Sequence, residues 1–178
     1  MTQPDPARIA GFDALLQLPG TADSAGLAIV EALSPVERDR AFNIAARRLA
    51  FQLLFEIDAG ATPPDALEQR LARVEGLGPV LHERVLAMVR GSYDARAAAD
   101  AEFVQLAPDW PTHRQPAVDR AILRLAHHEL TLGQTPGAVV VNEAVELARH
   151  YSTEKSPSFV NALLDRVLKR LSGPAEAR

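Results

Sequence analysis

Arginine and phenylalanine side chains share one line of a long helical segment, a combination suited to binding single-stranded RNA. The segment runs from about residue 35 to residue 58 and contains no internal glycine or proline. Guanidinium groups can pair with phosphates, while aromatic rings can stack on unpaired bases. The residues on or beside this line are Arg40, Asn43, Arg47, Arg48, Phe51 and Phe55. The pattern would also arise if the phenylalanines were core residues and the arginines a solvated face, so both interpretations stay open.

The run His127-His128-Glu129 is the other group whose residue types could support chemistry. Neighbouring residues on a helix point about 100° apart, and the spacing is not that of an H-E-x-x-H metal motif. The acidic residues of the chain form no recognisable catalytic pair, and neither a P-loop nor a nucleophile elbow occurs. The sequence has no cysteine, which excludes disulfides and thiolate metal sites. We therefore predict no metal, no cofactor and no enzymatic activity.

Helices must position these side chains, because apolar residues recur at helical spacing along the chain. In residues 118–171, three helical segments are joined by loops of a few residues and should pack as neighbours. The expected core residues are Ile122, Leu125, Ala126, Leu130, Val141, Ala144, Val145, Ala148, Val160, Leu163, Leu164, Val167, Leu168 and Leu171. The acidic Glu129 falls in the same stripe. No segment alternates as a strand does, so the sequence predicts an all-α fold.

Capping residues predict where several helices begin. Ser34-Pro35-Val36-Glu37 combines a capping box with proline at the first helical position. Thr135-Pro136 and Ser156-Pro157 predict two later helices that begin with a Thr or Ser N-cap. In the helices that follow, Asn142 and Asn161 are poor helix formers. We expect both asparagines to be buried and hydrogen-bonded.

The middle of the chain is divided by glycine and proline. A short helix is expected between residues 62 and 74, followed by a turn. The segment from Pro79 is amphipathic to about Arg90, and the pattern resumes after Gly91, so one helix or a kinked pair of helices should end near Pro108. The proline-rich loop after it holds the single tryptophan, Trp110.

Length and composition are those of one globular domain. Of 178 residues, 47% are hydrophobic and 24% are charged, which is ordinary for a soluble protein and argues against global disorder. No stretch approaches the roughly 18 apolar residues of a membrane span, and the first residues lack the features of a signal peptide. A cytoplasmic protein without a membrane partner is the expectation. The net charge of −4 gives no long-range attraction to nucleic acid.

Residues 1–36 are expected to form an extension that is partly ordered at best. They contain Asp5, Asp13, Asp23 and Glu31 against Arg8 alone, a net charge of −3. Prolines and glycine interrupt the segment and leave room for only short helices. It is either a loosely packed arm or a segment that folds back and regulates a surface. The main domain should cover 37–173, and 174–178 should be a polar tail.

Several segments, taken together and in order, resemble the bacterial transcription antitermination factor NusB family. They are ARRLAFQLLFE at 46–56, Trp110 with Arg114 ahead of VDRAILRLAHHEL, Pro136 before VVVNEAVELARHY, and Ser156 before SFVNALLD. The match covers roughly residues 37–172. The resemblance implies an all-α bundle of two packed helical subdomains, with about seven helices.

The resemblance also implies a function and a site. NusB-like proteins bind boxA-type single-stranded RNA together with NusE, a small ribosomal subunit protein. The complex helps RNA polymerase pass terminators, chiefly on ribosomal RNA operons. The RNA-binding residues that the resemblance implies are Arg47, Arg48, Phe55, Lys155 and Phe159. Arg40, one to two turns earlier, is added to these, and Asp119 is the implied contact with the ribosomal protein.

Two alternatives remain at this stage. The protein could be a protein–protein scaffold whose RNA surface is weak, or is masked by the extension or by homodimerisation. A weak RNA surface is suggested by residues 43–46, which contain no arginine where relatives often carry several. It could instead be a detached RNA-targeting domain of a ribosomal RNA cytosine methyltransferase. The chain continues only a few residues past the helical module, so we expect the stand-alone factor.

Overall fold

Every regular element in the computed structural model is helical within residues 34–74 and 77–173, the part that the structure describes. The seven α-helices of these ranges are α3 (Pro35–Asp58), α4 (Leu67–Leu71), α5 (Pro79–Asp94), α6 (Arg96–Leu106), α7 (Ala117–Leu132), α8 (Gly137–Tyr151) and α9 (Ser156–Ser172). Two 3-10 turns, η1 (Pro64–Ala66) and η2 (Thr112–Arg114), precede α4 and α7. The all-α prediction, with about seven helices, is confirmed. The expected tail and nearly all of the expected extension lie outside the described residues.

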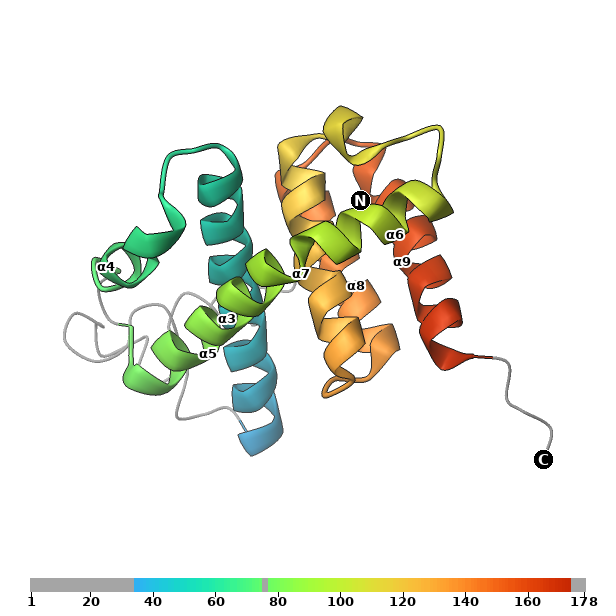
Figure 1. The fold of residues 1–178 in the computed structure, drawn as a ribbon. Coiled ribbons are helices and arrows are strands. Elements are labelled where there is room, and N and C mark those ends of the chain that lie inside the picture. The colour runs from blue at the N-terminus through green and yellow to red at the C-terminus, as the bar shows by residue number, and fades with distance from the viewer. Residues whose placement is uncertain (1–33, 75–76, 174–178) are drawn as a thin grey trace.

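The helices form two groups that lie side by side (Figure 1). One group contains α3, α4 and α5, and the other contains α7, α8 and α9, with α6 lying across it. The groups meet where α7 packs against both α3 and α5. At one end of the molecule α3 ends, α7 and α9 begin, and α8 ends. Loops from both sides of the sequence are therefore gathered at that end.

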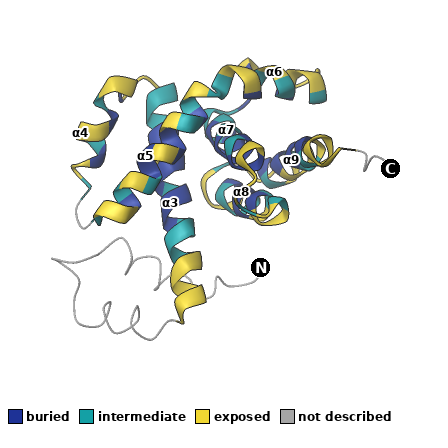
Figure 2. Ribbon diagram, turned by 60° about the horizontal axis from the view of Figure 1, so that its bottom comes forward, coloured by how far each residue is buried: buried dark blue, intermediate teal, exposed yellow. Residues whose placement is uncertain are grey.

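Helix α3 begins outside the bundle and enters it halfway along. The predicted capping box is present: Ser34 Oγ accepts from the Glu37 amide, and the Glu37 carboxylate accepts from the Ser34 amide at 2.8 Å. Figure 2 shows the helix changing from exposed at its start to buried further along. Its buried apolar stripe includes Ala46, Leu49, Ala50, Leu53 and Leu54, and Ile57 is half-buried. The first turns are thus stabilised by local capping, and the later turns by packing.

Helices α7, α8 and α9 form the core that the periodicity predicted, with the buried face of α8 turned slightly. Val140 and Glu143 are buried there, while Val141 and Val145 are only half-buried. Leu171 is 46% exposed, because the last turn of α9 lies on the surface. The prediction therefore identifies the buried face of each helix, but some residues at the margin of that face are more exposed than expected.

Of the two possibilities predicted between Pro79 and Pro108, the structure has a pair of helices, and the first of them continues through Gly91. Helix α5 continues through it to Asp94, and the chain kinks at Ala95 before α6. A β-carbon at position 91 would lie 2.2 Å from Nε2 of His128 on α7. The His128 ring thus occupies the space that a β-carbon at position 91 would need. The expected helix between residues 62 and 74 is shorter than predicted, and consists of η1 and α4.

Four polar side chains are used differently from the prediction. Asn142 and Asn161 are exposed, so water can satisfy their amides and no buried hydrogen bond is required. Thr135 does not cap α8, which begins at Gly137 after Pro136. Ser156 is the first residue of α9 rather than its N-cap, because its hydroxyl donates to Asp119.

Candidate nucleic-acid interface

Arg47 lies in the interior, which corrects its predicted place on an outer face. The residue is 5% exposed, and its Nε and Nη2 donate to the carboxylate of Glu129 on α7, at 2.9 and 2.8 Å. A bidentate pair of this kind fixes both planar groups. Arg47 therefore holds α3 against α7. Glu129 was the missed signal, since an acidic residue inside an apolar stripe needs a cationic partner.

The two phenylalanines of α3 differ in exposure. Phe51 is 3% exposed, and its ring centroid lies 5.2 Å from that of Tyr151 on α8. Phe55 is half-buried and packs against the core. Of the two interpretations left open, core packing is correct for Phe51. Phe55 lies at the boundary between the core and the surface.

The remaining basic residues predicted on α3 are accessible. Arg40 is exposed in the second turn, and Arg48 is half-buried. The guanidinium carbon of Arg48 lies 5.7 Å from the ring centroid of Tyr151, a cation–π arrangement. Tyr151 is 37% exposed, and the sequence-based prediction missed it. The available signal was an aromatic residue next to Arg149 and His150, at the end of a helix.

Lys155 and Phe159 belong to a second aromatic and basic group. Lys155 is exposed just before α9, and Phe159 makes an edge contact with Trp110, with ring centroids 6.4 Å apart. Trp110 is 44% exposed, and the guanidinium carbon of Arg114 lies 5.6 Å from its ring. We call Trp110, Arg114, Tyr151, Lys155 and Phe159 the end surface.

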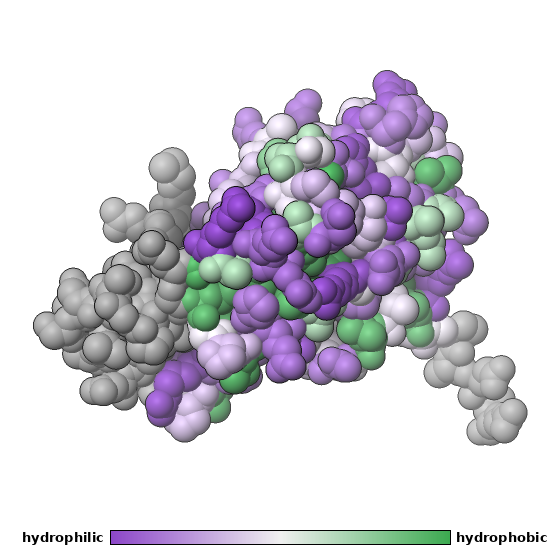
Figure 3. Space-filling model, turned by 60° about the vertical axis from the view of Figure 1, so that its left-hand side comes forward, coloured by the Kyte–Doolittle hydropathy of each residue, from purple (hydrophilic) through white to green (hydrophobic). Residues whose placement is uncertain are grey.

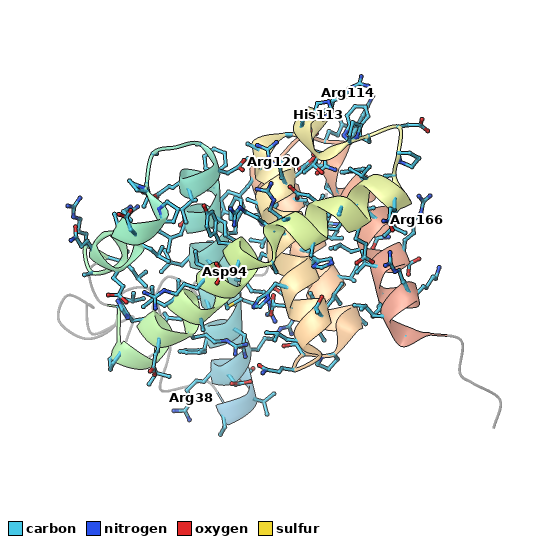
Figure 4. All side chains as sticks on the ribbon, in the orientation of Figure 1. Arg38, Asp94, His113, Arg114, Arg120 and Arg166 are labelled. Carbon is cyan, nitrogen blue, oxygen red and sulfur yellow. The ribbon has the colours of Figure 1, made fainter. Side chains whose placement is uncertain are left out.

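The end surface lies away from the start of α3. In Figure 4, Arg114 and His113 lie at the end of the molecule where α7 begins, and Arg38 lies at the opposite end. Trp110 and Arg114 belong to the loop that contains η2. The signal for this loop was present in the sequence, because a tryptophan four residues before an arginine stands among prolines. Residues from three separate segments are thus brought together at one end.

Arg120 of α7 holds the η2 loop in place. Its Nη1 donates to the carbonyl oxygens of Thr112 and Gln115 at 3.2 and 3.3 Å, and its Nε donates to Asp58 at the end of α3 at 2.9 Å. Arg124, one turn later, also binds Asp58, at 2.8 Å. Burial disfavours the charged form of Asp58, but the hydrogen bonds from these arginines outweigh it and hold the pKa of Asp58 below its usual 3.8.

Asp119 is buried, although the resemblance implied that it contacts a partner. It is 2% exposed, and its carboxylate accepts from Ser152 Oγ at 2.6 Å and from Ser156 Oγ at 2.8 Å. Asp119 lies in the first turn of α7, where the helix dipole favours a negative charge. Both serines flank the loop between α8 and α9. In this structure Asp119 organises that loop from inside.

Arg70 of α4 and Arg90 of α5 are engaged with acidic side chains. Arg70 binds Glu56 at 2.7 Å, and its hydrogen bond is the largest cause of the lowered pKa of Glu56. Arg90 pairs with Glu68 nearby. Figure 3 shows this side of the molecule as largely polar, with hydrophobic side chains in small groups. Two of the positive charges on this side are thus paired with acidic side chains.

The two histidines of α7 serve packing. His127 Nε2 lies 3.1 Å from Glu102, and its ring meets the edge of Phe103. His128 packs over Gly91, and burial lowers its pKa. Among the described residues, no group of three or more His, Asp or Glu side chains is arranged to hold a metal ion. None of the described helices is long and apolar enough to span a membrane.

The fold and the site together define a class of protein: small all-α domains that gather aromatic and basic side chains at one end. The sequence profile described as the NusB family matches residues 44–169. The chain is 44% identical over 125 residues to "Transcription antitermination protein NusB" of Streptomyces griseus, covering 68% of this chain and 87% of the relative. It is 39% identical over 127 residues to the protein of that name from Roseiflexus castenholzii, covering 70% and 89%. The chain belongs to the NusB family.

Solved structures agree with this assignment. NusB of T. maritima superposes with a TM-score of 0.64 at 31% identity, covering 70% of this chain and 89% of that one. A complex of the antitermination factors NusB and NusE with double-stranded RNA contains a chain with a TM-score of 0.64 at 24% identity, covering 72% and 97%. At that identity the second likeness concerns the fold alone.

Proposed function

We propose that this protein is a transcription antitermination factor that binds boxA-type single-stranded RNA through its end surface, together with NusE. The observation that carries the proposal is the exposed ring of Trp110 beside Arg114, with Lys155 just before α9 and Phe159 in its first turn. Its relatives from Streptomyces griseus and Roseiflexus castenholzii are named as antitermination proteins. Binding, without catalysis, is the activity proposed.

The end surface has the two components that single-stranded RNA requires. Trp110 and Tyr151 present rings on which unpaired bases can stack, and each ring has a guanidinium group within 6 Å. The cations of Arg114 and Lys155 can pair with phosphates. Stacking contributes about 1–3 kcal/mol per base in proteins of this kind. Affinity then comes from close contacts rather than from the net charge of −4.

The RNA path extends from the end surface toward α3. Arg48 and Phe55 are partly accessible on the later turns, and Arg40 is exposed on an early one. These residues, together with the end surface, form the proposed RNA contacts. Arg47 supports this path indirectly, because its pair with Glu129 fixes the position of α3 against α7.

NusE is the proposed protein partner, within an RNA polymerase complex that passes terminators on ribosomal RNA operons in the cytoplasm. A fold neighbour is described as NusB bound to NusE and RNA. Because Asp119 is buried, we propose that the α7 surface around it, rather than its carboxylate, contacts the partner. The buried carboxylate would then shape that surface from below.

A titration of a boxA-type RNA with the full chain, with and without NusE, tests the proposal. The logarithm of affinity should fall with the logarithm of salt concentration with a slope of roughly two to four, since each phosphate contact on a single strand contributes about 0.7. NusE should tighten the complex. Lys155→Ala should reduce the slope by about one contact, whereas the control Lys169→Ala on the far part of α9 should not. An affinity independent of salt would refute the mechanism.

A scaffold with a weak or masked RNA surface is the second candidate. It is favoured by the pairing of Arg47, Arg70, Arg90, Arg120 and Arg124 with acidic side chains, which removes much of the free positive charge. If the acidic extension masks the surface, deletion of residues 1–33 should strengthen RNA binding. Equal binding by the truncated and full chains would exclude masking. Co-purification with a methyltransferase partner would instead point to an RNA-targeting domain.

A further inference from the structure

The loop between α8 and α9 is short, polar and on the surface, yet one of its boundaries is held in the interior. Residues 152–155 join the two helices, and Thr153, Glu154 and Lys155 are exposed. Ser156, the next residue, is 3% exposed. A loop of this composition would ordinarily be free to change conformation. A buried anchor limits that freedom.

The anchor is a set of hydroxyls around one carboxylate. Asp119 accepts from Ser152 and Ser156 through different oxygens. The Ser156 hydroxyl also lies 3.0 Å from that of Ser152 and 2.8 Å from that of Thr153. Hydrogen bonds to an ionised carboxylate are shorter and stronger than those between neutral groups. One acidic side chain of α7 thus fixes the two ends of the loop relative to each other.

Fixing Ser156 also fixes the residues proposed to bind RNA. Lys155 directly precedes Ser156, and the Phe159 amide donates to the Lys155 carbonyl oxygen at 3.3 Å in the first turn of α9. The Phe159 ring in turn contacts Trp110. A shift of Ser156 would therefore move the Lys155 ammonium and loosen the contact between the two rings.

Stability alone does not explain a carboxylate at this place. Burying a charged group costs more than burying an apolar one of similar size, so an apolar side chain could fill the space at lower cost. The carboxylate accepts hydrogen bonds from two hydroxyl groups, and because hydrogen bonds are directional it fixes the orientation of both serines. Its placement under the loop points to a role in geometry.

We propose that Asp119 is a positioning residue that holds Lys155 and Phe159 in their RNA-binding arrangement through Ser152 and Ser156. The inference rests on the proposed RNA-binding function of the end surface. It gives the buried Asp119 a function that direct contact with a partner could not.

The first test needs no RNA, because Trp110 is the single tryptophan of the chain. In Asp119→Asn, an isosteric change, the Trp110 emission should shift to longer wavelength and acrylamide should quench it more strongly. Ser156→Ala should do the same to a smaller extent, and it replaces the first variant if Asp119→Asn does not fold. Ser92→Ala, which removes another buried serine hydroxyl, is the matched control. Unchanged Trp110 emission and quenching in both loop variants would overturn the proposal.

The second test is a double-mutant cycle on RNA affinity. Asp119→Asn should weaken binding roughly tenfold, equal to about 1.4 kcal/mol. Lys155→Ala should weaken binding in the wild-type background and have little additional effect in Asp119→Asn, because a displaced lysine has already lost its contact. Arg48→Ala should weaken binding equally in both backgrounds. Full additivity of Asp119→Asn with Lys155→Ala would overturn the positioning role.

The two failures can be told apart. If Lys155→Ala and Phe159→Ala leave RNA affinity unchanged in the wild-type background, the end surface is not the RNA site and the proposed function is wrong. The Trp110 measurement still decides in that case whether Asp119 positions the loop.

Discussion

Two arginine–aromatic groups in this protein have similar compositions and opposite environments. On α3, Arg47 is buried against Glu129 and Phe51 is part of the core. At the end surface, Trp110 is nearly half exposed and Arg114 lies over its ring. The first group joins helices, and the second is available to a ligand. The difference depends on whether an acidic partner elsewhere in the chain encloses the arginine.

This comparison separates stability from binding. A buried charge pair is expensive to break, because the remaining charge stays in a low-dielectric interior. An exposed cation next to an aromatic ring is inexpensive to remove for the fold, but it can be essential for a ligand. Substitutions in the two groups should therefore move different measurements.

Breaking the buried pair should have the largest effect. Arg47→Ala or Glu129→Ala should each lower the free energy of unfolding by about 3–5 kcal/mol, since each leaves an unpaired buried charge. Urea denaturation at neutral pH measures this. Replacing both residues together with Met and Leu should recover most of the loss. Arg114→Ala is the control and should stay within about 0.5 kcal/mol of the wild type. Equal effects of Arg47→Ala and Arg114→Ala would remove the distinction between the groups.

Alanine substitutions of Phe51 and Phe55 in α3 should lower stability in the order of their burial. Phe51→Ala should cost about 3–5 kcal/mol, the range for a fully buried phenylalanine, and Phe55→Ala should cost less. Thermal unfolding gives the ranking, and RNA titration shows whether the half-buried ring contributes to binding. A cost for Phe55→Ala as large as that for Phe51→Ala would make Phe55 a core residue and end its proposed stacking role.

Removing the exposed ring of the end surface should affect binding more than stability. Trp110→Ala should weaken RNA binding by about 1–3 kcal/mol, the range for one base stacked on an aromatic ring. Filter binding or anisotropy measures this. Trp110→Phe should retain most of the affinity, because a smaller ring still stacks. If Trp110→Ala binds RNA like the wild type, the end surface is not a stacking platform.

Acid should weaken the joint between the two helix groups. Because the pKa of Asp58 in the folded protein is below 3.8, its stabilising effect is complete above that pH and is lost as pH falls through the lowered value. Asp58→Asn should be less stable than wild type at neutral pH and should lose less stability between about pH 5 and pH 2. Urea midpoints across this range measure the difference, with Asp165→Asn on the exposed face of α9 as the control. Parallel curves would exclude the linkage.

The sequence predicts the helices far better than the use of their polar residues. Apolar periodicity is a local property, so the stripes of α7, α8 and α9 could be located before the structure. Nothing near Gly91 in the sequence shows that a helix continues through it with His128 packed over it. The burial of Arg47 similarly depends on Glu129, 82 residues away. Long-range partners decide these cases, and a single sequence does not display them.

The candidate site was predictable to a similar degree. Lys155 and Phe159 were identified through the family resemblance, and both lie at the end surface. In the sequence, Trp110 and Arg114 form part of the family resemblance without an assigned role, and no local pattern marks Tyr151 as a site residue. Ser156 looked like a helix cap, since its bond to Asp119 requires knowledge of how α7 and α9 approach each other. The end surface is built from three segments that lie far apart in the sequence, and local sequence patterns do not show that these segments meet.

The contacts of Arg120 imply an order of events during folding. Its guanidinium group joins Asp58, 62 residues earlier in the chain, to carbonyl groups of the loop that carries Trp110. Closing so long a stretch of chain is entropically slow compared with forming single helices. The full set of Arg120 contacts is therefore complete only when α3 and α7 have docked. Without this docking, the loop that carries Trp110 keeps only the short-range contacts of Arg120, so the geometry of the end surface depends on the joint between the two helix groups.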